Sequence, residues 1–109
     1  MPRRHPSYAP RTIRAVEMLG MEVARVRISR QVTQAELAER AGISAETLSS
    51  VEQGRPTVAI GTYFEVAHLL GIDLLEEGDE LDVAWSRARQ TLTLLPGRVR
   101  HTVPVDDEF

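Results

Sequence analysis

The sequence has 109 residues but no cysteine, and only 5% of the residues are aromatic. The absence of cysteine excludes disulfides, zinc–thiolate sites and thiol catalysis. No stretch approaches the roughly 18 apolar residues of a membrane span. The basic opening MPRRHPSYAPR leads into no apolar run, so we expect no signal peptide. These absences favour a cytoplasmic protein with one small domain and an aliphatic core.

Positive charge is concentrated in the first half of the chain. The net charge is −3, but residues 1–57 hold nine arginines against six acidic residues. Residues 58–109 hold four arginines against ten acidic residues. A basic front half and an acidic back half suit a protein that faces an anion with one side only.

Apolar residues recur at helical spacing along most of the chain. They predict helices over about 12–30, 33–42, 44–53, 60–70 and 80–92, with one more helical turn within 72–80. The residues expected to face inward are Val16, Leu19, Val23, Val26, Leu37, Ala38, Ala41, Leu48, Val51, Tyr63, Val66, Ala67, Leu70, Leu81, Ala84, Trp85, Ala88 and Leu92. Gly20, inside the first helix, predicts a close contact with another helix.

The stretch TQAELAERAGISAETLSSVEQG, residues 33–54, places two short helices on either side of one glycine. Thr33 and Glu36 form a capping-box pattern at the start of the first of these helices, and Ser44 caps the second. Counted from Gln34, position 5 is small, position 9 is a glycine that tolerates a positive φ, and positions 10, 15 and 18 are apolar. This spacing is the helix-turn-helix pattern.

Around this pattern, residues 18–72 resemble the DNA-binding domain of the Cro and phage-repressor (XRE) family. The resemblance is carried by LGMEVARVR, VTQAELAERAGIS, TLSSVEQGRPT and FEVAHLLGI. It implies an all-α, lambda-repressor-like bundle of five helices, to which the sequence adds a C-terminal helix and an extended or short β tail. It also implies a homodimer that binds double-stranded DNA, and we expect this dimer to repress transcription.

The resemblance assigns roles along the motif. Gln34 matches a glutamine that contacts DNA backbone and flanking bases. Arg27 and Glu52 match a structural pair, with a DNA contact as the alternative. The start of the third helix would read base edges, and the loop after it would touch phosphate. Helix N-termini also suit phosphate, so the predicted DNA-binding residues are Thr33, Gln34, Ser44, Ala45, Glu46, Thr47, Ser49, Ser50, Arg55 and Thr57.

Several of these side chains fit two roles. Glu46 either interacts with the positive end of its helix or accepts a hydrogen bond from a cytosine N4. Ser49 and Ser50 either read bases or simply face solvent, and Ala45 reaches at most a thymine methyl. The third helix carries no Arg, Asn or Gln before Gln53, so the DNA sequence that it reads stays open.

No other group of residues supports catalysis or metal binding. His5, His68 and His101 lack cysteine or carboxylate partners at ligand spacing. The serines of the motif lie near no candidate base. We therefore expect no enzyme, no metal and no cofactor. Trp85 fits the core or a dimer interface, with the wall of a ligand pocket as the alternative.

The chain divides into three predicted parts: a flexible basic arm over 1–11, a DNA-binding domain over 12–78, and a helix with a tail over 79–109 for dimerisation or partner binding. The arm either is disordered or tracks the minor groove and phosphates. Small family members with such tails also resemble HipB-like antitoxins. The alternative function is therefore an antitoxin that represses its own operon and binds a toxin protein through its C-terminal segment.

Overall fold

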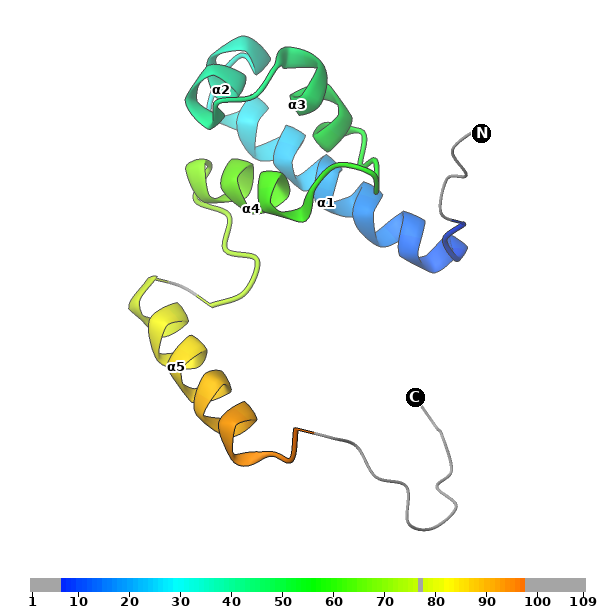
Figure 1. Cartoon of the computed structure of the whole chain (residues 1–109). Coiled ribbons are helices and arrows are strands. Elements are labelled where there is room, and N and C mark those ends of the chain that lie inside the picture. The colour runs from blue at the N-terminus through cyan, green and yellow to red at the C-terminus, as the bar shows by residue number, and fades with distance from the viewer. Residues whose placement is uncertain (1–6, 77, 98–109) are drawn as a thin grey trace. The chain divides into compact units, whose positions relative to one another are not determined.

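The structure, a computed structural model, describes residues 7–76 and 78–97 (Figure 1). These residues hold no strand, which confirms the predicted all-α class. The chain divides between Leu74 and Leu75 into two compact units, of which the first holds α1 to α4 and the second holds α5. The helices are α1 (Pro10–Ser29), α2 (Gln34–Ala41), α3 (Ala45–Glu52), α4 (Ile60–Leu69) and α5 (Gly78–Leu94).

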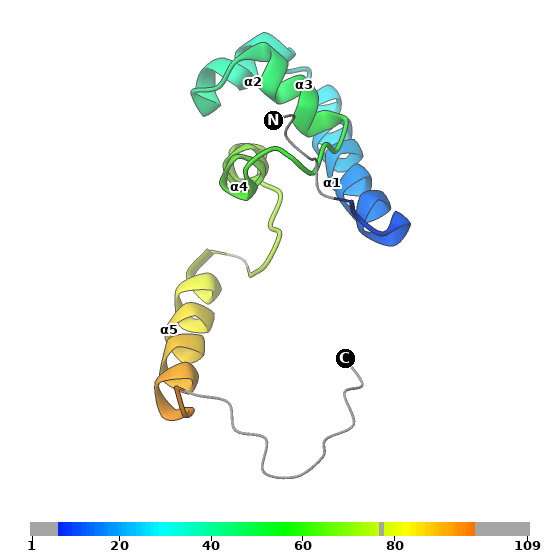
Figure 2. The ribbon, with the colours of Figure 1, turned by 45° about the vertical axis from the view of Figure 1, so that its right-hand side comes forward.

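The first unit is a helical bundle in which α3 packs on both α1 and α2, and α4 packs on α2. Both views show α3 lying beside α1 (Figures 1 and 2). The inward faces predicted for α1 to α4 are confirmed, because the apolar side chains of these helices meet in one cluster. Its buried members are Val23, Leu37, Ala38, Leu48, Val51, Tyr63, Val66 and Leu70.

The start of α1 lies earlier than predicted. α1 begins at Pro10, before the expected start near Thr12, and no side chain caps it. Proline is favoured in the first turn because its φ is already helical and its missing N–H has no partner there. Of the predicted arm over 1–11, residues 1–6 lie outside the described residues, and only Ser7–Ala9 precede the helix.

The turn between α2 and α3 is formed by two helix caps and a glycine, as the sequence predicts. Thr33 Oγ1 accepts a hydrogen bond from the Glu36 N–H at 3.1 Å, and Ser44 Oγ accepts one from the Thr47 N–H at 3.1 Å. Between these caps, Gly42 ends α2 with φ +69°, in the left-handed region that glycine adopts without strain. The chain therefore turns sharply and starts a new helix within a few residues.

Helix α5 departs from its prediction. None of its residues is buried, and Leu81, Trp85 and Leu92 are 44%, 61% and 69% exposed. The inward face expected for this helix, which also included Ala84 and Ala88, is therefore wrong, and so is a core position for Trp85. Among the described residues of the second unit, α5 has no other helix to cover its apolar side.

The segments on either side of α5 also differ from the predictions. The extra helical turn expected within 72–80 does not form, because Leu74–Glu76 bend and α5 starts only at Gly78. Residues 95–97 form no strand, and the rest of the predicted extended or β tail lies outside the described residues.

Gly20 brings α1 into backbone contact with α3, as its sequence position predicted. A Cβ added here would lie 2.5 Å from the Val51 carbonyl oxygen and 2.7 Å from the Glu52 carbonyl oxygen. Backbone atoms cannot rotate out of the way as a flexible side chain can. The absence of a side chain at Gly20 therefore sets how closely α3 lies on α1.

Gly20→Ala should lower the free energy of unfolding by about 2 kcal/mol, because overpacking outweighs the gain of about 1 kcal/mol in helix propensity. Gly61→Ala is the matched control, since a Cβ at this α4 position meets nothing within 4 Å. The control should raise stability by about 0.5 kcal/mol. Denaturant unfolding followed by circular dichroism measures both. Equal effects of the two substitutions would contradict the close contact.

Candidate nucleic-acid interface

The carboxylate of Glu52, at the end of α3, joins α1, α2 and α3. Arg27 of α1 donates to it through Nε at 2.6 Å and Nη2 at 3.0 Å, and the side-chain amide of Gln34 in α2 donates at 2.9 Å. Arg27 Nη1 also donates to the Val32 carbonyl at 2.9 Å. These bonds tie the orientation of α3 to both neighbouring helices and to the turn between α1 and α2.

The Arg27–Glu52 ion pair is largely withdrawn from water. The two side chains are only 13% and 8% exposed, so solvent screens their attraction less than at the surface. Hydrogen bonding to Glu52 raises the pKa of the Arg27 guanidinium above its ordinary value. The carboxylate of Glu52 therefore favours the charged form of the Arg27 guanidinium.

Gln34 has a structural contact in addition to its predicted contact with DNA. Its side chain is half-buried, and its amide nitrogen is bonded to Glu52. Gln34, the first residue of α2, therefore links the start of α2 to the end of α3.

The predicted DNA-binding residues occupy the N-terminus of α2, α3 with its N-cap, and the loop that follows α3. Their exposure divides them into two groups. Thr33, Ser44, Ala45, Glu46, Arg55 and Thr57 are exposed, whereas Gln34, Thr47, Ser49 and Ser50 are half-buried. The exposed group therefore has the better access to a large partner such as DNA.

Gln53 is a polar residue of this surface that the sequence reasoning did not select. Its Nε2 donates to Ser49 Oγ at 3.0 Å, and its Oε1 accepts from Arg55 Nε at 3.2 Å and Nη2 at 2.9 Å. Gln53 thereby connects α3 to the following loop and orients the Arg55 guanidinium. The four-residue spacing from Ser49 was the available sequence signal, but the bond to Arg55 depends on how the loop folds.

The backbone at Arg55 is held from two directions while its side chain is exposed. The Arg55 N–H donates to the Ser50 carbonyl at 3.0 Å, and the Tyr63 hydroxyl donates to the Arg55 carbonyl at 2.7 Å. Tyr63 is only 4% exposed, and this burial raises the pKa of its hydroxyl. A positive charge on a fixed backbone suits contact with a phosphate.

The N-terminus of α3 adds a favourable site for an anion. Its N-cap, Ser44, satisfies one backbone N–H through its hydroxyl. The remaining N–H groups of the first turn carry the partial positive charge of the helix dipole. Glu46 in the same turn interacts favourably with that dipole. Its exposed carboxylate is an acceptor that also fits a donor on a base edge.

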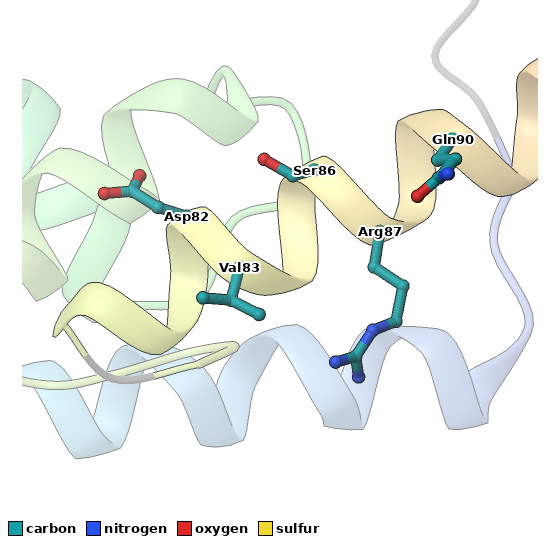
Figure 3. A pocket seen from close by; sticks show the side chains of 5 residues that line it. All are labelled: Asp82, Val83, Ser86, Arg87 and Gln90. Carbon is teal, nitrogen blue, oxygen red and sulfur yellow. The ribbon is translucent and has the colours of Figure 1, made fainter.

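The described residues outside this surface offer less chemistry. They contain no group of three or more His, Cys, Asp or Glu residues that could hold a metal ion. No described helix is both long and apolar enough to cross a membrane. A surface hollow of about 400 Å³ lies on α5, and its walls come from that helix alone (Figure 3). Such an open hollow lacks the enclosure of a small-molecule site.

Comparison with known proteins shows the family to which the first unit belongs. Residues 23–76 match the family described as helix-turn-helix. The chain belongs to the helix-turn-helix family. Over 60 residues it is 37% identical to a protein of Sinorhizobium fredii named uncharacterized HTH-type transcriptional regulator y4dJ, and the match covers 55% of this chain and 78% of that protein. No solved structure gives a significant match.

Family membership makes the chain a DNA-binding helix-turn-helix protein rather than an enzyme, in agreement with the class predicted from the sequence. The matched range includes α2, α3 and α4 and ends at Glu76. Helix α5 therefore lies outside the helix-turn-helix match.

Glu52→Ala should lower the free energy of unfolding of the helix-turn-helix unit by about 3 kcal/mol, because it leaves the positive charge of Arg27 buried without its carboxylate partner. Glu22→Ala is the control, since Glu22 forms an exposed ion pair with Arg25 on the same helix. We expect no measurable change for the control. Chemical unfolding distinguishes the two, and similar losses in both variants would show that burial of the Glu52 pair is unimportant.

Proposed function

We propose that this protein is a homodimeric transcriptional repressor that reads the major groove of double-stranded DNA with α3. The observation that carries the proposal is the exposed polar surface of α3 and its following loop, supported from behind by the bonds of Glu52. The name of the Sinorhizobium fredii relative supports a regulatory role.

Base recognition falls to the start and the exposed side of α3. Ala45 and Glu46 lie in its first turn and are exposed, and the half-buried Ser49 follows one turn later. A methyl group, a carboxylate and a hydroxyl complement a thymine methyl, a cytosine amino group and mixed base edges, respectively. Because these side chains are short, α3 must approach the bases closely.

Phosphate contacts fall to groups on either side of α3. The N-terminus of α2 at Thr33 and the loop at Arg55 and Thr57 are exposed and carry N–H, hydroxyl and guanidinium donors. Contacts of this kind set register and orientation on the duplex, while base contacts set specificity. In a two-fold dimer, two copies of α3 would enter successive major grooves about 34 Å apart.

Arg55→Ala should weaken binding to all DNA sequences and lower the slope of log affinity against log salt concentration by about one unit, because one phosphate contact is lost. Arg87→Ala is the matched control, since Arg87 is also exposed but belongs to the second unit. Titration of fluorescent DNA at several salt concentrations gives both quantities. An unchanged slope for Arg55→Ala, or an equal loss in the control, would contradict the phosphate contact.

Glu46→Ala should change the preferred DNA sequence more than the overall affinity, because it removes a base-reading acceptor and leaves the phosphate contacts intact. Glu39→Ala, on the exposed side of α2, should leave the preference unchanged. Selection from random DNA with the wild type and both variants checks this. Identical motifs for the wild type and Glu46→Ala would limit Glu46 to its interaction with the helix dipole.

The antitoxin alternative stays a prediction of the sequence. Of the C-terminal segment predicted to bind a toxin, residues 98–109 lie outside the described residues.

A further inference from the structure

Helix α5 carries an apolar stripe whose members alternate at spacings of four and three residues. They are Leu81, Trp85, Ala88, Leu92 and Leu95, the last directly after the helix end. This alternation places all five on one side of a helix and is the spacing of a two-stranded coiled coil. Leu81, Trp85, Leu92 and Leu95 are 44%, 61%, 69% and 56% exposed.

The other side of α5 is mainly polar. Figure 3 shows Asp82, Val83, Ser86, Arg87 and Gln90 along this helix, and none of them belongs to the stripe. A helix that is apolar on one side and polar on the other is stable when the apolar side is covered by a partner.

Charge changes sign along α5. Asp79, Glu80 and Asp82 lie in its first part, and Arg87 and Arg89 follow. Asp82 and Arg89 each come directly after a member of the stripe, so both lie along the same edge of it. The Arg89 guanidinium lies 5.3 Å from the centre of the Trp85 ring, which holds this positive charge beside the stripe.

We propose that α5 pairs with α5 of a second copy of the chain in antiparallel orientation, through the stripe and two Asp82–Arg89 ion pairs. The proposal rests on the homodimer proposed above and identifies its interface. It concerns a segment outside residues 23–76, so the helix-turn-helix match says nothing of it.

The sizes of the side chains favour this orientation. When two such helices run antiparallel, Trp85 faces Ala88 of the second copy and Leu81 faces Leu92 of the second copy. The largest member of the stripe then lies opposite the smallest one. A parallel pair would set Trp85 against Trp85 and Ala88 against Ala88, which crowds one layer and leaves a void in the next.

The charges favour the same orientation and also select the register. In the antiparallel register described, Asp82 lies beside Arg89 of the second copy, and two-fold symmetry repeats this pair. In a parallel arrangement Asp82 and Arg89 would lie on opposite sides of the interface from their counterparts, so no Asp82–Arg89 pair would form. Sliding one antiparallel helix by seven residues would bring like charges together, with Arg89 beside Arg89 or Asp82 beside Asp82. Repulsion therefore disfavours the shifted registers, and the parallel arrangement lacks the two ion pairs.

The pairing is short, because a helix of 17 residues is about 25 Å long and offers few layers. We therefore expect weak association of the chain by itself. Two copies held on neighbouring half-sites of one DNA molecule would have a high effective concentration, which strengthens the α5 contact without any new interaction.

Sedimentation equilibrium of the full chain tests the stripe. Leu92→Ser should weaken self-association at least ten-fold, whereas Val83→Ser is the matched control on the polar side and should leave it unchanged. Val83 is 55% exposed, so both substitutions remove an exposed aliphatic side chain. Equal effects of the two, or no effect of Leu92→Ser on a wild-type dimer, would overturn the proposal.

Charge reversal tests the orientation and the register. Asp82→Arg alone and Arg89→Asp alone should each weaken the dimer at least ten-fold, because each places like charges together. The double variant should restore it to within about three-fold. In a parallel dimer the single variants would behave like the wild type. Helix content measured by circular dichroism confirms that α5 still forms in each variant. Single variants that dimerise normally, or a double variant that stays weak, would overturn the antiparallel pairing.

Cross-linking gives the direction independently, because the chain has no cysteine of its own. Ala84→Cys and Thr91→Cys lie on the other edge of the stripe and face each other in the proposed register. When the two single-cysteine variants are combined and oxidised, the main product should be the disulfide between residue 84 of one copy and residue 91 of the other. A predominance of 84–84 or 91–91 disulfides would overturn the proposed register, and the absence of an 84–91 disulfide would overturn the antiparallel direction.

Failure of this proposal can be separated from failure of the proposed function. Binding of each variant to a single half-site depends on α3 and should be unchanged. A wild-type chain that stays monomeric both free and on two-half-site DNA would overturn the homodimer together with the α5 pairing. A dimer that survives Leu92→Ser and the charge reversals would overturn only the α5 pairing.

Discussion

The carboxylate of Glu52 is the point on which the geometry of the first unit depends. It accepts hydrogen bonds from Arg27 of α1 and Gln34 of α2 while belonging to α3 itself. Helices α2 and α3 have only eight residues each and are too short to be stable alone. Their mutual angle must therefore come from tertiary contacts, and the Glu52 bonds supply these at the polar edge of the apolar core.

Packing and the proposed recognition of DNA use different sides of α3. Leu48 and Val51 are buried, and the absence of a side chain at Gly20 lets α1 lie close behind them. The opposite side and the following loop carry the polar groups, with Gln53 orienting the guanidinium of Arg55. Recognition of DNA needs such a surface to be ordered before binding, because each side chain that is ordered only on contact lowers the affinity.

The second unit is suited to association with a second copy of the chain. A domain of this size buries only a modest core. Association of two copies also raises the affinity for an extended DNA site, because the second contact becomes intramolecular. Helix α5 leaves Trp85 and its apolar neighbours exposed. The alternation of large and small side chains and of opposite charges along α5 suits self-pairing in one direction. A DNA-reading unit and a pairing helix would then act together only when two half-sites lie at the correct spacing.

Local chemistry was enough to determine the caps at Thr33 and Ser44, the turn at Gly42 and the buried faces of α1 to α4, because each depends on residues within a few positions of one another. The predicted DNA-contacting residues come from the same spacing and stay predictions. Contacts between distant positions decided the rest. The bond of Gln34 to Glu52 and the role of Gln53 depend on how helices and loop meet in space. The exposure of the α5 stripe depends on whether another layer covers it, and no periodicity within one segment contains that information.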